Sequence, residues 1–329
     1  RITHFVLDEV HERGVDNDLL SLLIKLIIGQ QQHQAAAGVG VPSKLIIMSA
    51  TLQASIFSDY FKPLNITTPD AIFVGAKRFP VSQCFLEDIA STFSGGGSSG
   101  GLPKDCLGTL GRMEKAFSGI GGRRENGRLQ PEVTPEMCQL TMAMIRVLAS
   151  EKAKGGAASP VCRCVLIFLP GIQEILGMQE AFESGQGAGG GAMDNIHLHT
   201  LHSIVPHEEQ EEAFKPPPPG KIKVILATNI AESSITIPDV DCIFDFGMHR
   251  QIVYDDRRGM PVLMCDWCSQ ASVKQRTGRA GRVAPGRAFY MFTSSFMVGK
   301  AVGAGGGMAE HDITEMRRIS LESVVLRVK

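Results

Sequence analysis

Short apolar runs recur along the 329-residue chain, and they constrain its fold more than any other feature. A run of roughly four to eight residues that is apolar throughout is typical of a strand buried on both faces of a parallel sheet. Helical segments separate the runs, as the crossovers of a parallel sheet require. The pattern predicts an α/β protein. The runs lie at residues 2–7, 44–48, 161–169, 196–201, 222–227, 242–246 and 288–292, with helices expected at 19–28, 172–183 and 208–214.

Four stretches interrupt this alternation. Residues 30–40 are rich in Gln, Ala and Gly, residues 94–101 are nearly all Gly and Ser, residues 185–191 are Gly-rich, and residues 216–219 are prolines. Such compositions bury too little apolar area to offset the entropy lost on ordering. We therefore expect surface insertions or linkers there. In domain terms, flexible insertions are expected near residues 91–130, 185–191 and 215–220.

Composition limits the kinds of function that the chain can have. The net charge is −1, so nucleic-acid binding would have to come from local patches and not from a basic protein as a whole. The longest apolar stretches fall short of the ~20 residues of a membrane-spanning helix. The eight cysteines have no disulfide-like or zinc-ribbon spacing, which favours reduced thiols in a nuclear or cytoplasmic, hence intracellular, protein. Because the first residues already form an apolar run, we expect the chain to begin inside a domain, with no signal peptide.

Two adjacent carboxylates, Asp8 and Glu9, follow the first apolar run, and His11 lies two residues further on. Residues at the carboxyl end of a parallel strand face the ligand crevice of an open α/β sheet. A carboxylate there can hold Mg²⁺ through water, and its neighbour can orient or deprotonate an attacking water, as phosphoryl transfer requires. The alternative is a solvated acidic turn. Taken alone, these residues favour that alternative.

Residues 275–282 carry arginines three positions apart, which we expect on one side of a helix. Two guanidiniums so spaced, those of Arg279 and Arg282, can reach one triphosphate and neutralise charge developing on its γ-phosphoryl group. Residues 273–287 contain five basic residues and no acidic one, which creates a local positive field. The alternative is a basic surface helix, and the other motifs argue against it.

Taken in order, these segments resemble the motifs of the DEAH/DExH-box RNA helicases of superfamily 2, over nearly the whole chain. Six motifs in the required order exclude a chance similarity, so the chain resembles part of such a helicase, beginning at motif II. Residues 8–11 resemble motif II with Val for the usual Ala, 49–51 motif III, 165–175 motif IV, 201–203 the short RNA-facing motif after it, 227–237 motif V and 275–282 motif VI.

The resemblance implies tandem RecA-like parallel-sheet domains, the first one truncated, with ATP between them and single-stranded RNA across their top. It assigns residues 1–75 to the C-terminal half of the first RecA-like domain. Residues 76–300 would form the second RecA-like domain, the helicase C-terminal domain. Residues 301–329 would form a linker and the start of a winged-helix domain.

The resemblance also implies roles for individual residues. Asp8 and Glu9 would hold Mg²⁺, Glu9 would activate water, and His11 would contact the region of Gln275. Arg279 and Arg282 would act as arginine fingers. The implied ATP-binding residues are Asp8, Glu9, Ser49, Thr51, Ser234, Thr236, Gln275, Arg279 and Arg282. The implied RNA-binding residues are Gly171, His202, Ser203, Thr228 and Asn229, which would hold phosphates without reading bases.

The chain departs from the family pattern at three places. The 329 residues contain no Gly-x-x-x-x-Gly-Lys-Thr phosphate loop, so we expect this chain alone to hydrolyse ATP poorly. Met248 stands where many members have an aromatic residue that stacks on adenine. Pro238 displaces the Asp that contacts the ribose. These two changes leave the nucleobase and ribose preference open.

Two functions remain open at this point. The first is an ATP-dependent RNA helicase or RNA-remodelling ATPase, with ATP and Mg²⁺ as cofactors, RNA and an activating protein as partners, and no membrane association. The second is a non-catalytic RNA-binding or scaffold protein derived from a helicase. Asp8, Glu9, Gln275, Arg279 and Arg282 are all present, and a motor without activity would not need all of them. The sequence therefore favours the first.

Overall fold

The computed structural model describes most of the chain as two units. The described residues are 2–50, 54–62, 72, 74–75, 79–94, 101–154, 162–184, 195–202, 205–232, 235, 237–299 and 306–328. The first unit comprises Arg1–Ala76, Ile252–Leu263 and Ile313–Lys329, and the second comprises Lys77–Gln251 and Met264–Asp312. Among the helices of the described ranges, none combines the length and hydropathy needed to cross a bilayer.

The first unit contains a parallel pair of strands, β1 (His4–Leu7) and β2 (Lys44–Ile47), which confirms the first two predicted strands within a residue or two. Leu7 of β1 and Ile24 and Ile28 of the connecting helix bury their side chains together with Phe57. The unit also contains η1 (Val10–Glu12, a 3-10 helix), α1 (Val15–Ala36), α2 (Ala54–Phe61), η5 (Glu315–Arg317, a 3-10 helix) and α10 (Glu322–Val328).

Helix α1 corrects one prediction from the sequence. Residues 30–40 were expected to form a surface insertion, but the helix continues through Ala36. Gln and Ala are good helix formers, so the polar composition that suggested a linker is compatible with an exposed helix end. The side-chain oxygen of Gln31 also accepts a hydrogen bond of 2.7 Å from the backbone N–H of Ser43, which ties the returning chain to the helix.

The described part of the second unit is built on a six-stranded sheet with the order β3-β12-β9-β6-β8-β7, in which all neighbouring strands are parallel. Strand β6 and strand β8 are buried along their whole length, as their apolar sequences predicted. The strands are β3 (Val81–Cys84), β6 (Cys164–Phe168), β7 (Ile196–Leu201), β8 (Ile222–Ala227), β9 (Cys242–Asp245) and β12 (Gly286–Tyr290).

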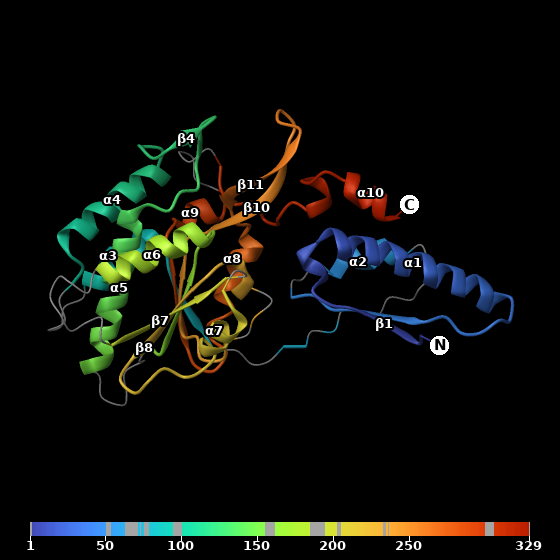
Figure 1. Cartoon of the computed structure of the whole chain (residues 1–329), viewed down its shortest axis with the longest axis horizontal. Helices are drawn as coiled ribbons and strands as arrows, with labels where there is room; N and C mark the ends of the chain where they lie inside the picture. The colour runs from blue at the N-terminus through green and yellow to red at the C-terminus, as the bar shows by residue number, and fades with distance from the viewer. Residues whose placement is uncertain are drawn as a thin grey trace. The chain divides into compact units, whose positions relative to one another are not determined.

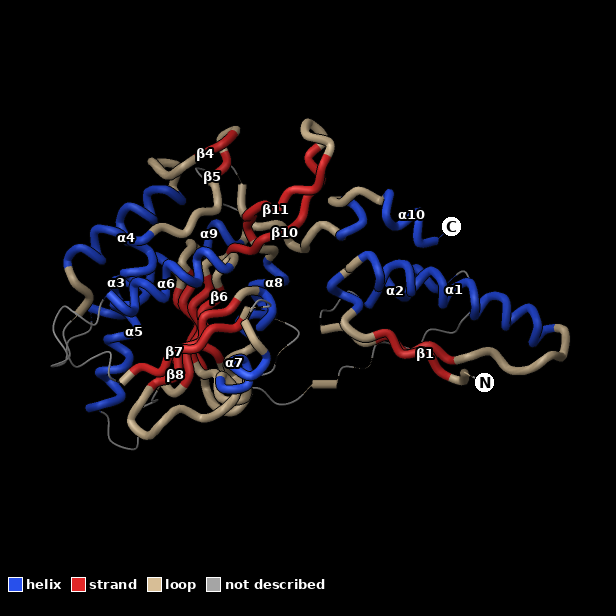
Figure 2. The backbone as a smooth tube through the Cα atoms, in the orientation of Figure 1, coloured by secondary structure: helices blue, strands red, loops and turns tan. Residues whose placement is uncertain are grey.

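Helices cover both faces of this sheet. Helices α3 to α6 contact one another in succession on one side of it, whereas α8 lies against the other side (Figure 1, Figure 2). The helices of the unit are α3 (Leu86–Ser94), α4 (Lys104–Phe117), α5 (Pro135–Lys154), α6 (Ile172–Ser184), α7 (His207–Glu212), α8 (Gln270–Thr277) and α9 (Ser294–Met297), with the 3-10 helix η4 (Asn229–Ala231). The fold is thus the predicted α/β class.

The segment 91–130, expected to be a flexible insertion, is folded where the structure describes it. It contains α4 and a small antiparallel hairpin of β4 (Arg124–Glu125) and β5 (Arg128–Leu129). Leu110 and Phe117 of α4 are buried in the main core, and the indole N–H of Trp267 donates a 2.9 Å hydrogen bond to the carbonyl of Leu129. The prediction failed because the glycines flanking α4 hid its apolar stripe. Residues 95–100 of the insertion expected at 94–101 lie outside the described residues, as does the whole of the insertion expected at 185–191.

A second hairpin joins β10 (Met248–Asp255) to β11 (Met260–Trp267). It begins at the end of β9, where Gly247 has a positive φ of 69°. A Cβ atom at Gly247 would lie 2.7 Å from the Phe292 ring, so this turn requires glycine. The turn therefore fixes the direction in which β10 leaves the sheet.

Candidate functional site

The acidic residues after β1 lie in a strained turn. Glu9 has φ 50° and ψ 35°, the left-handed region that a residue with a side chain occupies at a cost of roughly 1–2 kcal/mol. Its backbone N–H donates a 2.8 Å hydrogen bond to Oδ1 of Asp8, which helps to hold the turn. Both side chains remain accessible, since Asp8 is exposed and the Glu9 side chain is 44% exposed. Two carboxylates are therefore presented together at the carboxyl end of a strand.

His11 connects this turn with the end of β2. Its side chain is only 6% exposed, and its Nδ1 atom accepts a 3.3 Å hydrogen bond from the backbone N–H of Ala50. The same nitrogen lies 3.4 Å from Oε2 of Glu9. A single nitrogen cannot accept from Ala50 and donate to Glu9 at once, so the position of the imidazole proton selects which contact is made. The residues resembling motifs II and III thus meet through His11, next to Ser49.

The donor set after β1 fits Mg²⁺. Carboxylate oxygens are hard ligands, and Mg²⁺ commonly uses one or two of them together with water and phosphate oxygens. Asp8 and Glu9 supply such oxygens at an accessible position. Over the described ranges, no three His, Cys, Asp or Glu side chains gather into a metal-binding cluster.

The described residues that were predicted to bind RNA lie along the edge of the six-stranded sheet that the carboxyl ends of its strands form. Strands β6, β8 and β7 are adjacent and in register, with Phe168 and Leu201 both opposite Ala227. Because these parallel strands end at the same level, the residues that follow them are neighbours. The residues brought to this edge are Gly171, His202, Thr228 and Asn229.

Backbone turns hold each of these residues in place. The carbonyl of Gly171 accepts from the N–H of Ile175 at 3.1 Å, in the first turn of α6. Buried Thr228 is the N-cap of η4, and its carbonyl accepts from the N–H of Ala231 at 3.2 Å, while Asn229 is exposed. The carbonyl of His202 accepts from the N–H of Val205 at 2.9 Å. A backbone hydrogen bond therefore fixes Gly171, His202 and Thr228 at this edge.

The arginines of residues 275–282 do not share one helix, which corrects a second prediction. Helix α8 ends at Thr277, and Gly281 has a positive φ of 72°. A Cβ atom there would lie 2.7 Å from the carbonyl oxygen of Phe79, so the chain approaches the entry of β3 too closely for a side chain. Gln275 lies on α8, whereas Arg279 and Arg282 lie in the turns that follow it. The glycines that end the helix were visible in the sequence.

Arg279 links the turn after α8 to the segment after β8. Arg279 is only 8% exposed. Nη1 donates a 3.1 Å hydrogen bond to the carbonyl of Ile235, and Nη2 donates to the carbonyl of Glu232. The segments that resemble motifs V and VI are therefore in direct contact within the second unit.

Arg276 is a central residue that sequence reasoning missed. It is 1% exposed. Its Nε atom donates a 2.9 Å hydrogen bond to Oε2 of Glu232, and its Nη1 atom donates one of 2.9 Å to Oδ1 of Asp245. Nη1 also donates to the carbonyl of Met248 at 3.2 Å. Burial opposes the charge, but nearby Cys268, Asp245 and Glu232 outweigh it, so the pKa of Arg276 is raised. Asp245 was the available signal, because an acidic residue ending an apolar strand requires a buried partner.

Four of the predicted site residues lie outside the described residues. They are Thr51, Ser203, Ser234 and Thr236.

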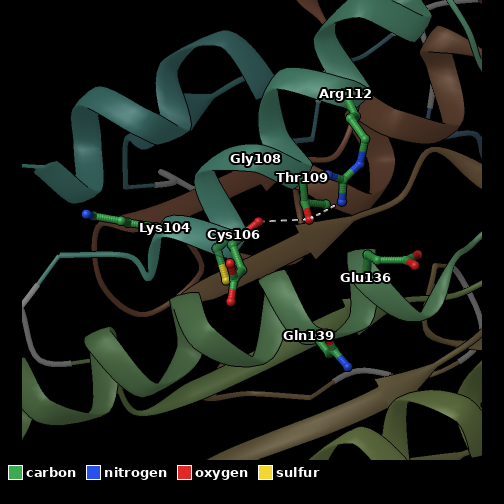
Figure 3. Close-up of a pocket in the computed structure, with 8 residues that line it drawn as sticks. Lys104, Cys106, Gly108, Thr109, Arg112, Glu136 and Gln139 are labelled. Atoms are coloured by element: carbon green, nitrogen blue, oxygen red, sulfur yellow. Dashed lines mark hydrogen bonds between the residues drawn. The ribbon is translucent and has the colours of Figure 1, made fainter.

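A hollow of about 300 Å³ lies elsewhere in the second unit, between α4 and α5 (Figure 3). Charged residues of both signs line it, among them Lys104, Arg112 and Glu136, and Arg112 donates a 3.0 Å hydrogen bond to Oγ1 of Thr109. None of the predicted site residues lines this hollow. It is therefore separate from the strand ends that carry the site.

Comparison with known proteins places this geometry in a family. Residues 160–284 match the model of the helicase conserved C-terminal domain. The "Probable ATP-dependent RNA helicase spindle-E" of Anopheles gambiae is 33% identical over 336 residues, covering 99% of this chain and 20% of that protein. The "Putative ATP-dependent RNA helicase DHX57" of Homo sapiens is 32% identical over 371 residues, covering 100% of this chain and 25% of that protein.

A solved structure agrees with these sequence relatives. The crystal structure of the E. coli DExH-box NTPase HrpB superposes with a TM-score of 0.65 at 25% sequence identity, covering 99% of this chain and 31% of that one. The chain spans about a fifth to a quarter of the length of its curated relatives. The matches to the domain model, the helicase sequences and the HrpB structure agree, so the chain belongs to the DEAH/DExH-box helicase family.

Proposed function

We propose that this chain is a segment of an ATP-dependent RNA helicase or RNA-remodelling ATPase, in which Asp8, Glu9 and His11 act in ATP hydrolysis. The observation that carries the proposal is the turn after β1, where the Nδ1 atom of His11 lies within 3.4 Å of Oε2 of Glu9 and 3.3 Å from the backbone N–H of Ala50. Family membership supports it, because the names of the two relatives describe ATP-dependent RNA helicases. The proposed domains are the C-terminal half of a first RecA-like domain in residues 1–75, a second RecA-like domain in 76–300, and a linker with the start of a winged-helix domain in 301–329.

In the proposed mechanism, the chain's own residues position ATP and move one proton. Asp8 and Glu9 would hold Mg²⁺, which screens the negative charge of the phosphates when bound. Glu9 accepts the proton of the attacking water, and its half-exposed carboxylate is accessible for this. Arg279, Arg282 and Gln275 would contact the nucleotide, together with Ser49, Thr51, Ser234 and Thr236. Planar guanidiniums suit this role because they match phosphate oxygens in pairs.

RNA would bind along the edge formed after β6, β7 and β8. Gly171, His202, Ser203, Thr228 and Asn229 would contact phosphates there through backbone and small polar groups. Such contacts fix the position of a strand without reading its bases. We therefore propose sequence-nonspecific binding of RNA.

The experiment that tests the proposed function is Glu9→Gln in the full-length protein. ATP hydrolysis stimulated by RNA should fall by about a hundredfold to ten-thousandfold, the contribution of a positioned general base. Binding of ATP should change little, because the glutamine keeps the size of the side chain. The matched control is Glu12→Gln, an exposed carboxylate three residues away, which should leave hydrolysis unchanged. Equal turnover in the parent and the Glu9 variant would falsify the assignment.

A further inference from the structure

Beside Gly171, an ion pair crosses from α6 to β10. Nη2 of Arg250 lies 2.8 Å from Oε1 of Glu174, and it also donates to Oε1 of Gln173 at 3.3 Å. The Glu174 side chain is 18% exposed and the Arg250 side chain 27% exposed. The pair is therefore partly withdrawn from water, so salt screens it less than it screens a surface pair.

Both charged groups lie directly against the Gly171 backbone. A Cβ atom at Gly171 would lie 2.6 Å from Nε and 2.8 Å from Cδ of Arg250, and 3.2 Å from Oε2 of Glu174. Oε2 of Glu174 and Nε of Arg250 are themselves buried, and neither has a hydrogen-bond partner in the described part of the chain. The charge of this pair therefore acts at Gly171, where the proposed function puts an RNA phosphate.

Glu174 has two opposing effects at this position. It is the third residue of α6, and an acidic side chain in the first turn of a helix stabilises the helix. The same negative charge repels any phosphate that approaches Gly171. A compensating positive charge from another element removes the repulsion and keeps the stabilisation of the helix. Arg250 is placed to provide that charge.

We propose that the Glu174–Arg250 ion pair sets the charge at Gly171, with Arg250 as a positioning residue that cancels a carboxylate otherwise repelling RNA phosphate. The inference rests on the proposed function, since it assumes RNA at this edge of the sheet. The inference predicts that removing Glu174 and removing Arg250 change RNA affinity in opposite directions, which a salt bridge that only stabilises the fold does not predict. If the pair served only stability, removing either partner would weaken RNA binding in the same way.

The test measures the affinity of the full-length protein for a fluorescein-labelled uridine oligonucleotide, without nucleotide, at about 0.15 M salt, where charges are screened over ~8 Å. Glu174→Gln should tighten binding and Arg250→Gln should weaken it, each by about twofold to fivefold, the scale of partly exposed charge pairs. The double variant should return close to the parent. Arg250→Lys, which keeps the charge, should also stay close to the parent. At ~1 M salt, where the screening length is only ~3 Å, the differences should shrink.

Two matched controls separate this local effect from net charge. Glu180→Gln removes an exposed carboxylate further along α6. Arg163→Gln removes an arginine that pairs with Asp241 and directly precedes the first residue of β6, at the end of the strand away from Gly171. Both should leave affinity within about twofold of the parent. Folding of every variant is checked by circular dichroism, and Glu174→Gln alone still tests the sign if Arg250→Gln does not fold.

The outcomes distinguish the inference from the proposed function. Weaker or unchanged binding by folded Glu174→Gln would overturn the inference, as would a control that shifts affinity as much as its site variant. A parent protein that does not bind the oligonucleotide would instead overturn the proposed function. Opposite signs for the two single variants, cancelled in the double variant, would establish the inference.

Discussion

Three arginines within seven residues occupy three different environments, although the sequence presents them as one motif. Arg276 is buried between Glu232 and Asp245, and Arg279 is held by two backbone carbonyls. Arg282 is half-buried in the turn that follows. The three side chains therefore cannot all have the same role. Burial and partners, which spacing alone does not show, distinguish the structural arginine from the two proposed to contact ATP.

Replacement by lysine should affect stability differently at Arg279 and Arg282, the two arginines outside helix α8. Arg282→Lys keeps the charge but loses the planar fork, so RNA-stimulated hydrolysis should fall by ~10³ to 10⁵, the range contributed by arginine fingers. RNA affinity without nucleotide and the midpoint of unfolding should not change. Arg279→Lys should lower hydrolysis and also the unfolding midpoint, because one ammonium group does not replace the paired bonds to Glu232 and Ile235.

Turnover and urea unfolding measured on both variants check this prediction, with Arg257→Lys on the β10–β11 turn as the control. Weakened RNA binding by Arg282→Lys with normal hydrolysis would favour the alternative of a passive RNA-binding protein.

At the scale of elements, strands were easier to predict than helices. Strands β6, β8 and β9 are buried on both faces, so each is an apolar run that composition alone reveals. Helix boundaries depend on weaker signals. The polar end of α1 and the glycine-flanked α4 were both read as insertions, because low apolar content there reflects exposure and not a lack of structure.

The candidate site could likewise be predicted only in part. The sequence predicted that residues following adjacent strands lie close together, because the carboxyl ends of parallel strands meet at one edge of the sheet. The contact between His11 and Ala50 and the pair between Glu174 and Arg250 did not follow, because each joins residues about 40 to 80 positions apart. Nothing in local composition specifies which distant side chain comes within bonding distance.

Because α4 packs into the main core, it should contribute to the free energy of unfolding. Phe117 is 6% exposed, and its ring lies 5.8 Å from Trp267 and 5.0 Å from Phe296, centre to centre. Phe117→Ala removes these contacts and leaves a cavity, so the free energy of unfolding should fall by about 3–5 kcal/mol. Urea unfolding followed by circular dichroism measures it. Leu107→Ala, at an exposed position of the same helix, should change that free energy by no more than about 0.5 kcal/mol. Equal effects of the two changes would contradict a packed α4.

At the scale of the whole molecule, partly buried histidines should make the fold sensitive to acid. Burial, together with the neighbouring His197 and Lys223, lowers the pKa of His199 on β7 to about 4, although Glu212 opposes the shift. Burial also lowers the pKa of His249. Both histidines titrate near ~6.5 in an unfolded chain. Between these values the unfolded chain binds protons that the folded protein does not, so stability falls as the pH falls from about 6.5 towards 4.

The midpoint of urea unfolding, followed by fluorescence of the single tryptophan, Trp267, should accordingly be lower at pH 5 than at pH 7. His199→Gln should reduce this difference, because one proton-linked group is lost. The exposed His33 provides the control, and its replacement by Gln should leave the difference unchanged. A pH dependence identical in the parent and His199→Gln would show that burial of this ring is not linked to folding.

The order of strands in the six-stranded sheet also bears on how a ribosome can produce this protein. Strand β3 is an edge strand whose partner is β12, and Val81 pairs with Gly286, about 200 residues later. At ~5–20 residues per second, β12 is synthesised roughly 10–40 s after β3. During that interval the hydrogen-bonding edge of β3 has no strand to receive it. Faster synthesis of the intervening residues shortens this interval, and with it the time in which β3 can pair with another molecule.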